Sequence, residues 1–448
     1  MSEGLKIPGS FEAMRTEGGI SVRNKKRAVA EEDKRRRKMA ELTVTKDGRL
    51  DIGVSPPPVL NVAPFPPYPA FTGSQVAMAD RLELEKDKRT IALVYPRDGA
   101  WWLEVWSPAS TGYFYLGTKS NLVEVVANAS RLLRTKVVHV EDNNGLPLNL
   151  VQGLENSGLR TILSIHDFVF FCRRPHLVER PFEPDAEFCD YSTELLRCKV
   201  CLRDIDPGGR TTQTDYRRQA GPSLYDASLL IFPSVFLQRQ YEVLFSERHP
   251  GQKTAVVAPA TARSEAVGGW GGRPNIAFVG GVYPHRGAAL IQPIMDRVRE
   301  SQPKAAGFVY GDGEGELFKL VRKAKKVKIQ GYYQQGTLPE LLVRDRIAVA
   351  VLPSIAPEAY SLVVDECLSA GIPAVAFEHG AVGERLSFWA VGELVPLDLG
   401  ANGLAGAVVN ALGRKKRVPD SVIRTLPQLD RVARKYFELY KAQRARAR

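Results

Sequence analysis

The feature that most constrains the fold of this chain is an alternation of short apolar runs with longer segments of helical spacing. The alternation is clearest after residue 274, where each apolar run is followed by a segment with a helical apolar pattern. Strands that alternate with helices form parallel sheets, and the functional groups of such sheets gather at the carboxyl ends of the strands. The predicted strands of this part are NIAFVGG, AAGFVYGDGEG, VKIQGYY, IAVAVLPS and PAVAFEHG.

A second, less regular alternation precedes it, with TIALVYP, KVVHVED and RTILSIHD as predicted strands. A chain of 448 residues is also too long for one ordinary core. The glycine-rich stretch SEAVGGWGGRP, residues 264–274, is typical of a hinge. We therefore predict an α/β protein with two Rossmann-like, doubly wound domains that face each other across a cleft, the first over residues 89–263 and the second over residues 264–430.

The two ends of the chain differ from these domains in composition. Residues 1–88 are basic at first and then rich in proline, in SPPPVLNVAPFPPYPAF. Because proline cannot donate a hydrogen bond to a sheet, we expect a largely irregular arm there and no central strand. Residues 431–448 are predicted to form a basic helix or tail.

The formal net charge of +12 predicts attraction to an anionic partner. Much of the excess lies in RNKKRAVAEEDKRRRK, residues 23–38, and in RKKR, residues 414–417. Nucleotides, nucleic acid and lipid headgroups all fit this charge, and so does a simple solvated basic arm. No apolar stretch reaches the roughly 20 residues of a membrane span. We expect a cytoplasmic protein whose membrane contact, if any, is peripheral and made with anionic lipid.

Four of the five cysteines are grouped in one segment. The CKVC pair has the spacing that lets both thiolates bind one zinc ion, and the two thiols upstream can complete a tetrahedron. A structural zinc site therefore competes with the alternative of four reduced, unliganded thiols, and a catalytic metal is not expected. The four residues are Cys172, Cys189, Cys198 and Cys201.

Two glutamates flank the start of a predicted helix in PEAYSLVVDECLSAGIPAVAFEHGAVGE, residues 357–384. Glu358 falls in the loop after the strand IAVAVLPS, and Glu366 lies on the helix, with Ser361 as its N-cap. Carboxylates in a crevice accept hydrogen bonds from vicinal hydroxyl groups, so the pair suits recognition of a sugar; general acid–base catalysis, as in glycoside hydrolases, is the alternative. His166 ends the strand RTILSIHD and faces the crevice, unless it is only a hydrogen-bonded strand terminus.

The surroundings of these glutamates resemble the donor-site signature of the retaining glycosyltransferases of family four, or glycosyl transferases group 1, which have the GT-B fold. The matching features run from LPS through the apolar helix, A-x-G-x-P and a short strand to a glycine loop that ends in Glu384. Four further matches follow the order of the family, so the resemblance covers about residues 135–390. They are VVHVEDNNGLPLNL, TILSIHDFVFFCRRPHL, FVGGVYPHRG and VYGDGEGEL.

The resemblance implies a role for each matching residue. Glu366 would hold the ribose hydroxyls of a nucleotide, Glu358 the hydroxyls of the transferred sugar, and His166 would contact that sugar. Arg286 takes the place of a phosphate-binding lysine and is still cationic. Gly281 stands where the family has an arginine, which weakens the diphosphate clamp unless backbone amides replace it. The remaining donor-binding residues implied are Gly280, Gly281, Gly380, Glu384 and Tyr333, although an aromatic residue at a strand end, such as Tyr333, more often belongs to the core.

The function implied by the resemblance is the retaining transfer of a sugar from a nucleotide-diphosphate sugar to a hydroxyl of a glycan or lipid-linked acceptor, with no cofactor required. His166, Glu358 and Arg286 would be its catalytic residues. Two alternatives stay open. The first is a glycosyltransferase that acts on nucleic acid, held by the basic arms. The second, motivated by Gly281, is a non-catalytic scaffold that binds sugar nucleotides.

Overall fold

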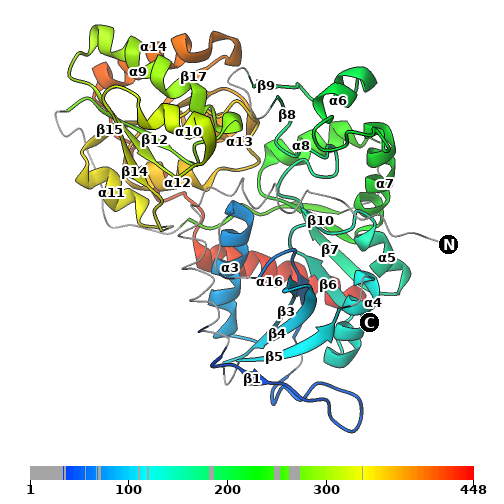
Figure 1. The fold of residues 1–448 in the computed structure, drawn as a ribbon. Helices are drawn as coiled ribbons and strands as arrows, with labels where there is room; N and C mark the ends of the chain where they lie inside the picture. The colour runs from blue at the N-terminus through cyan, green and yellow to red at the C-terminus, as the bar shows by residue number, and fades with distance from the viewer. Residues whose placement is uncertain are drawn as a thin grey trace.

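The computed structural model describes residue 34 and residues 37–447 with short gaps. Two lobes, each built on one β-sheet with its helices, lie side by side (Figure 1). Most of the expected hinge at residues 264–274 and of the basic segment at residues 23–38 lies outside the described residues. The gaps are residues 56, 67, 69–71, 109–110, 119–120, 181–185, 247–252, 262–272 and 335.

The C-terminal lobe, residues 273–426, has the regular alternation predicted from the sequence. Its six strands are all parallel, and the order reverses beside β12, which lies between β13 and β15. In spatial order the strands are β14 (Val327–Gly331), β13 (Ala306–Tyr310), β12 (Asn275–Val279), β15 (Ile347–Leu352), β16 (Ala374–Phe377) and β17 (Glu393–Val395). The helices are α9 (Ile291–Ser301), α10 (Gly315–Arg322), α11 (Leu338–Arg344), α12 (Leu362–Ser369), α13 (Gly380–Trp389), α14 (Gly400–Arg414) and α15 (Asp420–Ile423). Ligands of such sheets bind where the strand order reverses, outside the carboxyl ends of the strands.

The N-terminal lobe is built on a nine-stranded sheet and is less regular. Strands β3, β4 and β5 form an antiparallel meander, and the other pairings are parallel. In spatial order the strands are β1 (Ala40–Glu41), β5 (Thr111–Gly117), β4 (Ala100–Trp106), β3 (Ile91–Arg97), β2 (Leu60–Val62), β6 (Val137–Val140), β7 (Arg160–Ser164), β10 (Leu229–Phe232) and β11 (Thr254–Val256). A small hairpin joins β8 (Val178–Glu179) to β9 (Glu187–Phe188), and the helices are α3 (Gly73–Lys86), α4 (Leu122–Leu133), α5 (Leu150–Asn156), α6 (Leu195–Cys201), α7 (Gln213–Asp226) and α8 (Val235–Leu244).

The prediction that residues 1–88 form a largely irregular arm is wrong for two elements. β2 is a fully buried strand in the middle of the sheet, paired with β3 and β6, and it is followed by the helix α3. The prolines stand on both sides of Leu60–Val62 and none stands within it. The missing proline N–H groups therefore fall outside the hydrogen-bond ladder, and the sheet is not interrupted.

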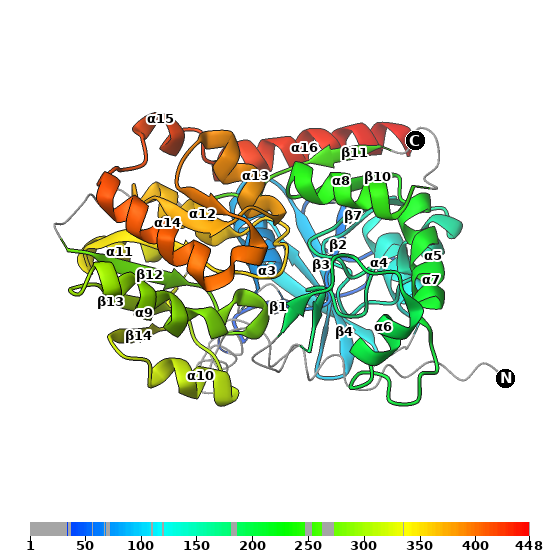
Figure 2. The same ribbon diagram turned by 90° about the horizontal axis from the view of Figure 1, so that it is seen from above.

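The C-terminal segment forms the long helix α16 (Leu429–Arg446), which packs on the N-terminal lobe and not on the lobe that precedes it. Val432, Tyr436 and Tyr440 lie in one core cluster with residues of β6, β7 and β10. Figure 2 shows this helix running back beside β11. The expected basic helix is thus a structural part of the N-terminal lobe.

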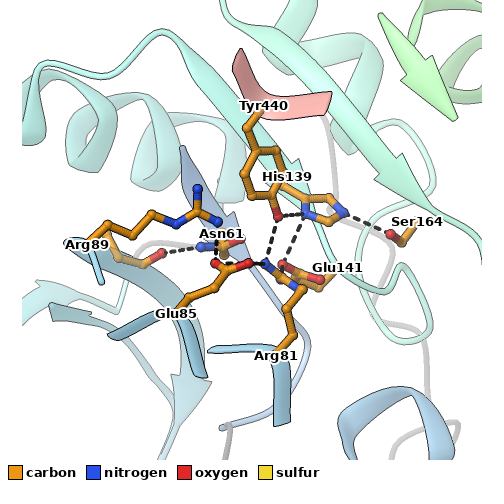
Figure 3. A network of polar contacts seen from close by, with 9 residues as sticks. Asn61, Arg81, Glu85, Arg89, His139, Glu141, Ser164 and Tyr440 are labelled. Atoms are coloured by element: carbon orange, nitrogen blue, oxygen red, sulfur yellow. Dashed lines mark hydrogen bonds and ion pairs between the residues drawn. The ribbon is translucent and has the colours of Figure 1, made fainter. Parts of the chain in front are cut away.

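A buried polar network joins α16 to α3 and β6 (Figure 3). Arg81 is 2% exposed, forms an ion pair with Glu141 and donates to the Tyr440 hydroxyl at 2.8 Å. Nδ1 of His139 lies 2.8 Å from the same hydroxyl. Burial opposes the charge of Glu141, but Arg81 outweighs it and holds the pKa of Glu141 at about 2. Further partners in the network are Glu85, Arg89 and Ser164, while the neighbouring Asn61 donates to the carbonyl oxygen of Ala92.

Among the helices that the structure describes, none combines the length and the apolar character needed to cross a bilayer.

Candidate active site

Glu366 lies on α12 and is 4% exposed. The N–H of Gly336 donates to its Oε1 at 2.9 Å, and the Tyr333 hydroxyl donates to Oε2 at 3.4 Å. Burial raises the pKa of Glu366 to about 7; these two hydrogen bonds oppose the shift, and the charge of Asp80 on α3 adds to it. The predicted ribose-binding carboxyl is therefore buried, contacts the predicted Tyr333, and lies within electrostatic reach of the N-terminal lobe.

Glu358 follows β15 and forms an ion pair with Arg286, at the end of the 3₁₀ turn Pro284–Arg286 after β12. The side chain of Glu358 is 10% exposed, and that of Arg286 is 37% exposed. Burial disfavours the charge of Glu358, but Arg286 outweighs it and holds the pKa of Glu358 below its ordinary value. The structure thus brings together the predicted sugar-binding carboxylate and the predicted phosphate-binding cation.

The turn that carries Arg286 is fixed by the loop after β15. The carbonyl oxygen of His285 accepts hydrogen bonds from the N–H groups of residues 355–356 at 3.1 and 3.2 Å. Gly287 has φ 70°, and a Cβ there would lie 1.8 Å from the carbonyl oxygen of Pro353. Only glycine permits this approach, so the turn packs directly against the loop.

Helix α13 starts beside Glu358. Gly380 has φ 66°, and a Cβ there would lie 2.7 Å from the Glu358 nitrogen, while the N–H of Ala381 donates to the Glu358 carbonyl oxygen at 2.8 Å. His379 precedes the helix, and its Nε2 donates to the Ser354 carbonyl oxygen at 2.9 Å. The first N–H groups of a helix attract anions, so this end of α13 suits a phosphate.

The other predicted donor residues have described partners. Glu384 accepts a hydrogen bond from the N–H of Phe236 at 3.0 Å, which ties α13 to α8 of the N-terminal lobe. The N–H of Gly280 donates to the Tyr310 carbonyl oxygen at 2.9 Å, so this amide is occupied. Ligand contacts of Glu384, Gly280 and Gly281 stay predictions.

His166 follows β7 in the N-terminal lobe. It lines a small cavity of about 20 Å³ together with Arg81, Glu141, Ser164 and Tyr436. Three of these lining residues, Arg81, Glu141 and Ser164, belong to the network drawn in Figure 3. The contact of His166 with a transferred sugar stays a prediction.

The four grouped cysteines do not form a metal site in this structure. All four are described and free, and no three Cys, His, Asp or Glu side chains in the described part of the chain could hold a metal ion. Burial raises the pKa of Cys172 to about 12 and also raises the pKa of Cys189 and Cys201. The structure gives no support to the zinc expectation and agrees with the alternative of reduced thiols.

Two ring contacts between the lobes were not foreseen. The rings of His176 and His285 stack at 4.1 Å, and Phe188 of β9 meets His379 edge-on at 5.8 Å. Each of these contacts joins residues that are about 100 or more positions apart. No local spacing in the sequence signals such a pair. The only hint is that two of these rings lie next to predicted site residues: His379 is inside the glycine loop, and His285 directly precedes Arg286.

Comparison with known proteins assigns a family resemblance to one lobe and a fold to both. Residues 273–414, from β12 to α14, match the family model described as glycosyl transferases group 1. No curated protein sequence gives a significant match.

Solved structures match most of the chain at low identity. Sucrose-phosphate synthase from Thermosynechococcus elongatus is 14% identical, with a TM-score of 0.57 over 86% of this chain and 99% of its own. Anabaena HepE in complex with UDP and glucose is 13% identical, with a TM-score of 0.56 over 86% and 99%. The catalytic domain of starch synthase IV from Arabidopsis thaliana, bound to ADP and acarbose, is 10% identical, with a TM-score of 0.56 over 87% and 100%. These likenesses establish the predicted fold: the two Rossmann-like lobes form a GT-B fold.

Proposed function

We propose that the protein is a glycosyltransferase that moves a sugar from a nucleotide-diphosphate sugar to a hydroxyl of a glycan or lipid-linked acceptor, with retention of the anomeric configuration. One observation carries the proposal. The Arg286–Glu358 ion pair and the first turn of α13 meet after the neighbouring strands β12, β15 and β16. The group 1 family match over residues 273–414 supports it, as do the UDP and ADP bound in solved structures of the same fold.

The donor would be held by three groups with different chemistry. Glu366 would accept hydrogen bonds from the ribose hydroxyls, because a carboxylate has two oxygens for two vicinal donors. Arg286 is a half-exposed guanidinium that can bind two phosphate oxygens at once. When it turns from Glu358 to the diphosphate, Glu358 becomes free to accept hydrogen bonds from the sugar.

Charge develops on the diphosphate as the bond to the anomeric carbon breaks. Arg286 and the first N–H groups of α13 other than that of Ala381, which is bonded to Glu358, would stabilise that charge, which is where a preorganised site contributes most to the rate. The transfer needs no side-chain nucleophile, and an oxygen of the leaving phosphate takes the proton of the acceptor hydroxyl. Gly281 supplies no second cation, so Arg286 and the α13 amides carry this role alone.

The test is a set of thermal shifts with UDP, GDP, ADP and CMP, free and as sugar conjugates, on wild type and Glu366→Ala. A ligand at 100 times its Kd stabilises a protein by about 2.7 kcal/mol. We expect one nucleotide to stabilise the wild type and not the variant. No shift with any of them, in folded protein, would contradict the proposed donor site.

The finer parts of the proposal have their own measurements. The anomeric configuration of the product by NMR tests retention, and unchanged turnover in EDTA tests independence from metal. Binding of a nucleotide sugar without transfer or donor hydrolysis would favour the scaffold. Salt-dependent binding to nucleic acid that is lost with residues 1–50 would favour a nucleic-acid acceptor.

A further inference from the structure

The two lobes are joined by a ring stack beside the predicted phosphate site. His176, in the connection between β7 and β8, stacks on His285 of the C-terminal lobe with ring centroids 4.1 Å apart and planes within 4°. The ring of Tyr283 is also nearly parallel to His285, at 5.7 Å and 6°. Aromatic pairs contribute about 0.5–1.5 kcal/mol beyond the area that they bury.

This stack acts on the turn that ends in Arg286. His285 is 8% exposed, and its carbonyl oxygen is held by the N–H groups of residues 355–356. One carbonyl oxygen of the turn is therefore held by the C-terminal lobe, while the ring of His285 is covered by the N-terminal lobe. Arg286 is the next residue, so the direction of its side chain depends on both contacts.

The charges around the stack favour a neutral ring. Burial lowers the pKa of His285 well below its ordinary value, and the charges of His176 and Arg286 act in the same direction. A neutral His285 can stack without placing a second cation beside Arg286. The contact thus works through ring packing, which a phenylalanine can reproduce.

We propose that His176 is a positioning residue for the diphosphate site: by stacking on His285, the N-terminal lobe fixes the turn that aims Arg286 at the phosphates. Arg286 is then in place only when the two lobes are in contact, which couples closure to binding of the leaving group. The role of Arg286 rests on the proposed function, but the stack and its effect on the turn do not.

The first experiment needs no ligand. Hydrogen exchange of a peptide that covers residues 283–288 is compared in wild type, His176→Ala and His176→Phe. We expect exchange about three- to tenfold faster in the alanine variant, and wild-type exchange in the phenylalanine variant. Phe188→Ala is the matched control, because it removes the other ring contact between the lobes, at α13. Equal exchange in wild type and His176→Ala would overturn the proposal.

The second experiment measures affinity for the nucleoside diphosphate that stabilises the wild type, and for its monophosphate. We expect His176→Ala to bind the diphosphate about three- to tenfold more weakly and the monophosphate unchanged, with rescue in His176→Phe. Unchanged diphosphate affinity would overturn the positioning role. If the wild type binds no nucleotide, the proposed function fails, and the exchange experiment still decides whether the stack holds the turn.

Discussion

Each lobe contains an arginine–glutamate pair, and the two pairs differ in burial. In the N-terminal lobe, the side chains of Arg81 and Glu141 are 2% and 4% exposed. In the C-terminal lobe, those of Arg286 and Glu358 are 37% and 10% exposed. We call Arg81–Glu141 the sealed pair and Arg286–Glu358 the open pair.

The partners of each pair explain what the difference means. Arg81 also contacts Glu85 and the Tyr440 hydroxyl and lies 4.6 Å from the ring centroid of Tyr436. A buried charge with every neighbour in place is structural, because removing one partner leaves another charge uncompensated. In the second pair Glu358 is also largely buried but Arg286 is open to solvent, so the guanidinium can leave Glu358 for a ligand. We therefore propose that the first pair serves folding and the second ligand binding.

Arg81→Met breaks the sealed pair. We expect it to lower the free energy of unfolding by about 3–5 kcal/mol, because Glu141 and Glu85 lose their buried counter-ion. Urea denaturation measures the loss, with the 74% exposed Arg218→Met as the surface control. A loss below about 1 kcal/mol would show that the network is not what holds α16 on the sheet.

Arg286→Ala breaks the open pair. We expect a smaller loss of stability than in Arg81→Met, because Glu358 loses its counter-ion but Arg286 is open to solvent. We also expect a fall in kcat of about 10²–10³, because the charge on the leaving diphosphate loses its cation. Initial rates with the donor identified by thermal shift give the result. Arg286→Lys, which keeps the charge, should retain part of the activity, and full activity in the alanine variant would remove Arg286 from the mechanism.

Glu366 adds a third case to the comparison, because it is buried and no cation in the described part of the chain shifts its pKa. Its pKa is about 7 in the folded protein and 4.5 when unperturbed. Between these values the folded state keeps a proton that the unfolded state has lost, so stability falls as the pH rises from 4.5 to 7 and is level above. Glu366→Gln removes this dependence, and we expect it to gain about 1–3 kcal/mol on wild type between pH 4.5 and pH 8.

Urea denaturation of both proteins at these two pH values measures this gain. The affinity of the wild type for nucleotide should rise as the pH increases through 7, in contrast to its stability, because the ionised carboxylate is the better hydrogen-bond acceptor. If the difference in stability between wild type and variant is the same at both pH values, the pKa of Glu366 lies near its ordinary value.

Ser361→Gly tests the backbone behind Glu358. Ser361 has φ 72° and occupies the N-cap position predicted for it, but its side chain makes no capping hydrogen bond. Glycine adopts a positive φ without strain, so we expect a gain of about 0.5–1 kcal/mol, partly offset by the freer unfolded chain. A raised Tm supports this expectation, and a lowered Tm would mean that the contact of the Ser361 hydroxyl with the Glu358 carboxylate outweighs the backbone strain.

Sequence predicted the C-terminal lobe better than the N-terminal lobe, for a physical reason. Strands buried on both faces, such as Ile347–Leu352, are continuous apolar runs, and the residues after them necessarily lie at one edge of the sheet. The resemblance to the family then implied that Glu358 and Arg286 belong to one donor site. In the N-terminal lobe, β2 is only three residues long and is flanked by prolines. Its sequence therefore did not predict a strand.

Other features depended on signals that are weak or distant in the sequence. The Asp98–Gly99 turn between β3 and β4 has φ 50° and 74°, and this dipeptide is a hairpin signal that was available and not used. The docking of α16 joins Tyr440 to Arg81, and the Glu384 carboxylate meets an amide 148 positions away. Contacts between elements so far apart follow from packing of the whole fold, which no local pattern contains.

The most direct test of the account is the affinity of wild type and Arg286→Ala for a nucleoside diphosphate and its monophosphate, by titration calorimetry. The account predicts that the wild type binds the diphosphate about tenfold or more tightly than the monophosphate, and that Arg286→Ala loses this difference while its monophosphate affinity is unchanged. An undiminished preference for the diphosphate in Arg286→Ala would contradict the claim that Arg286 leaves Glu358 to bind the phosphates.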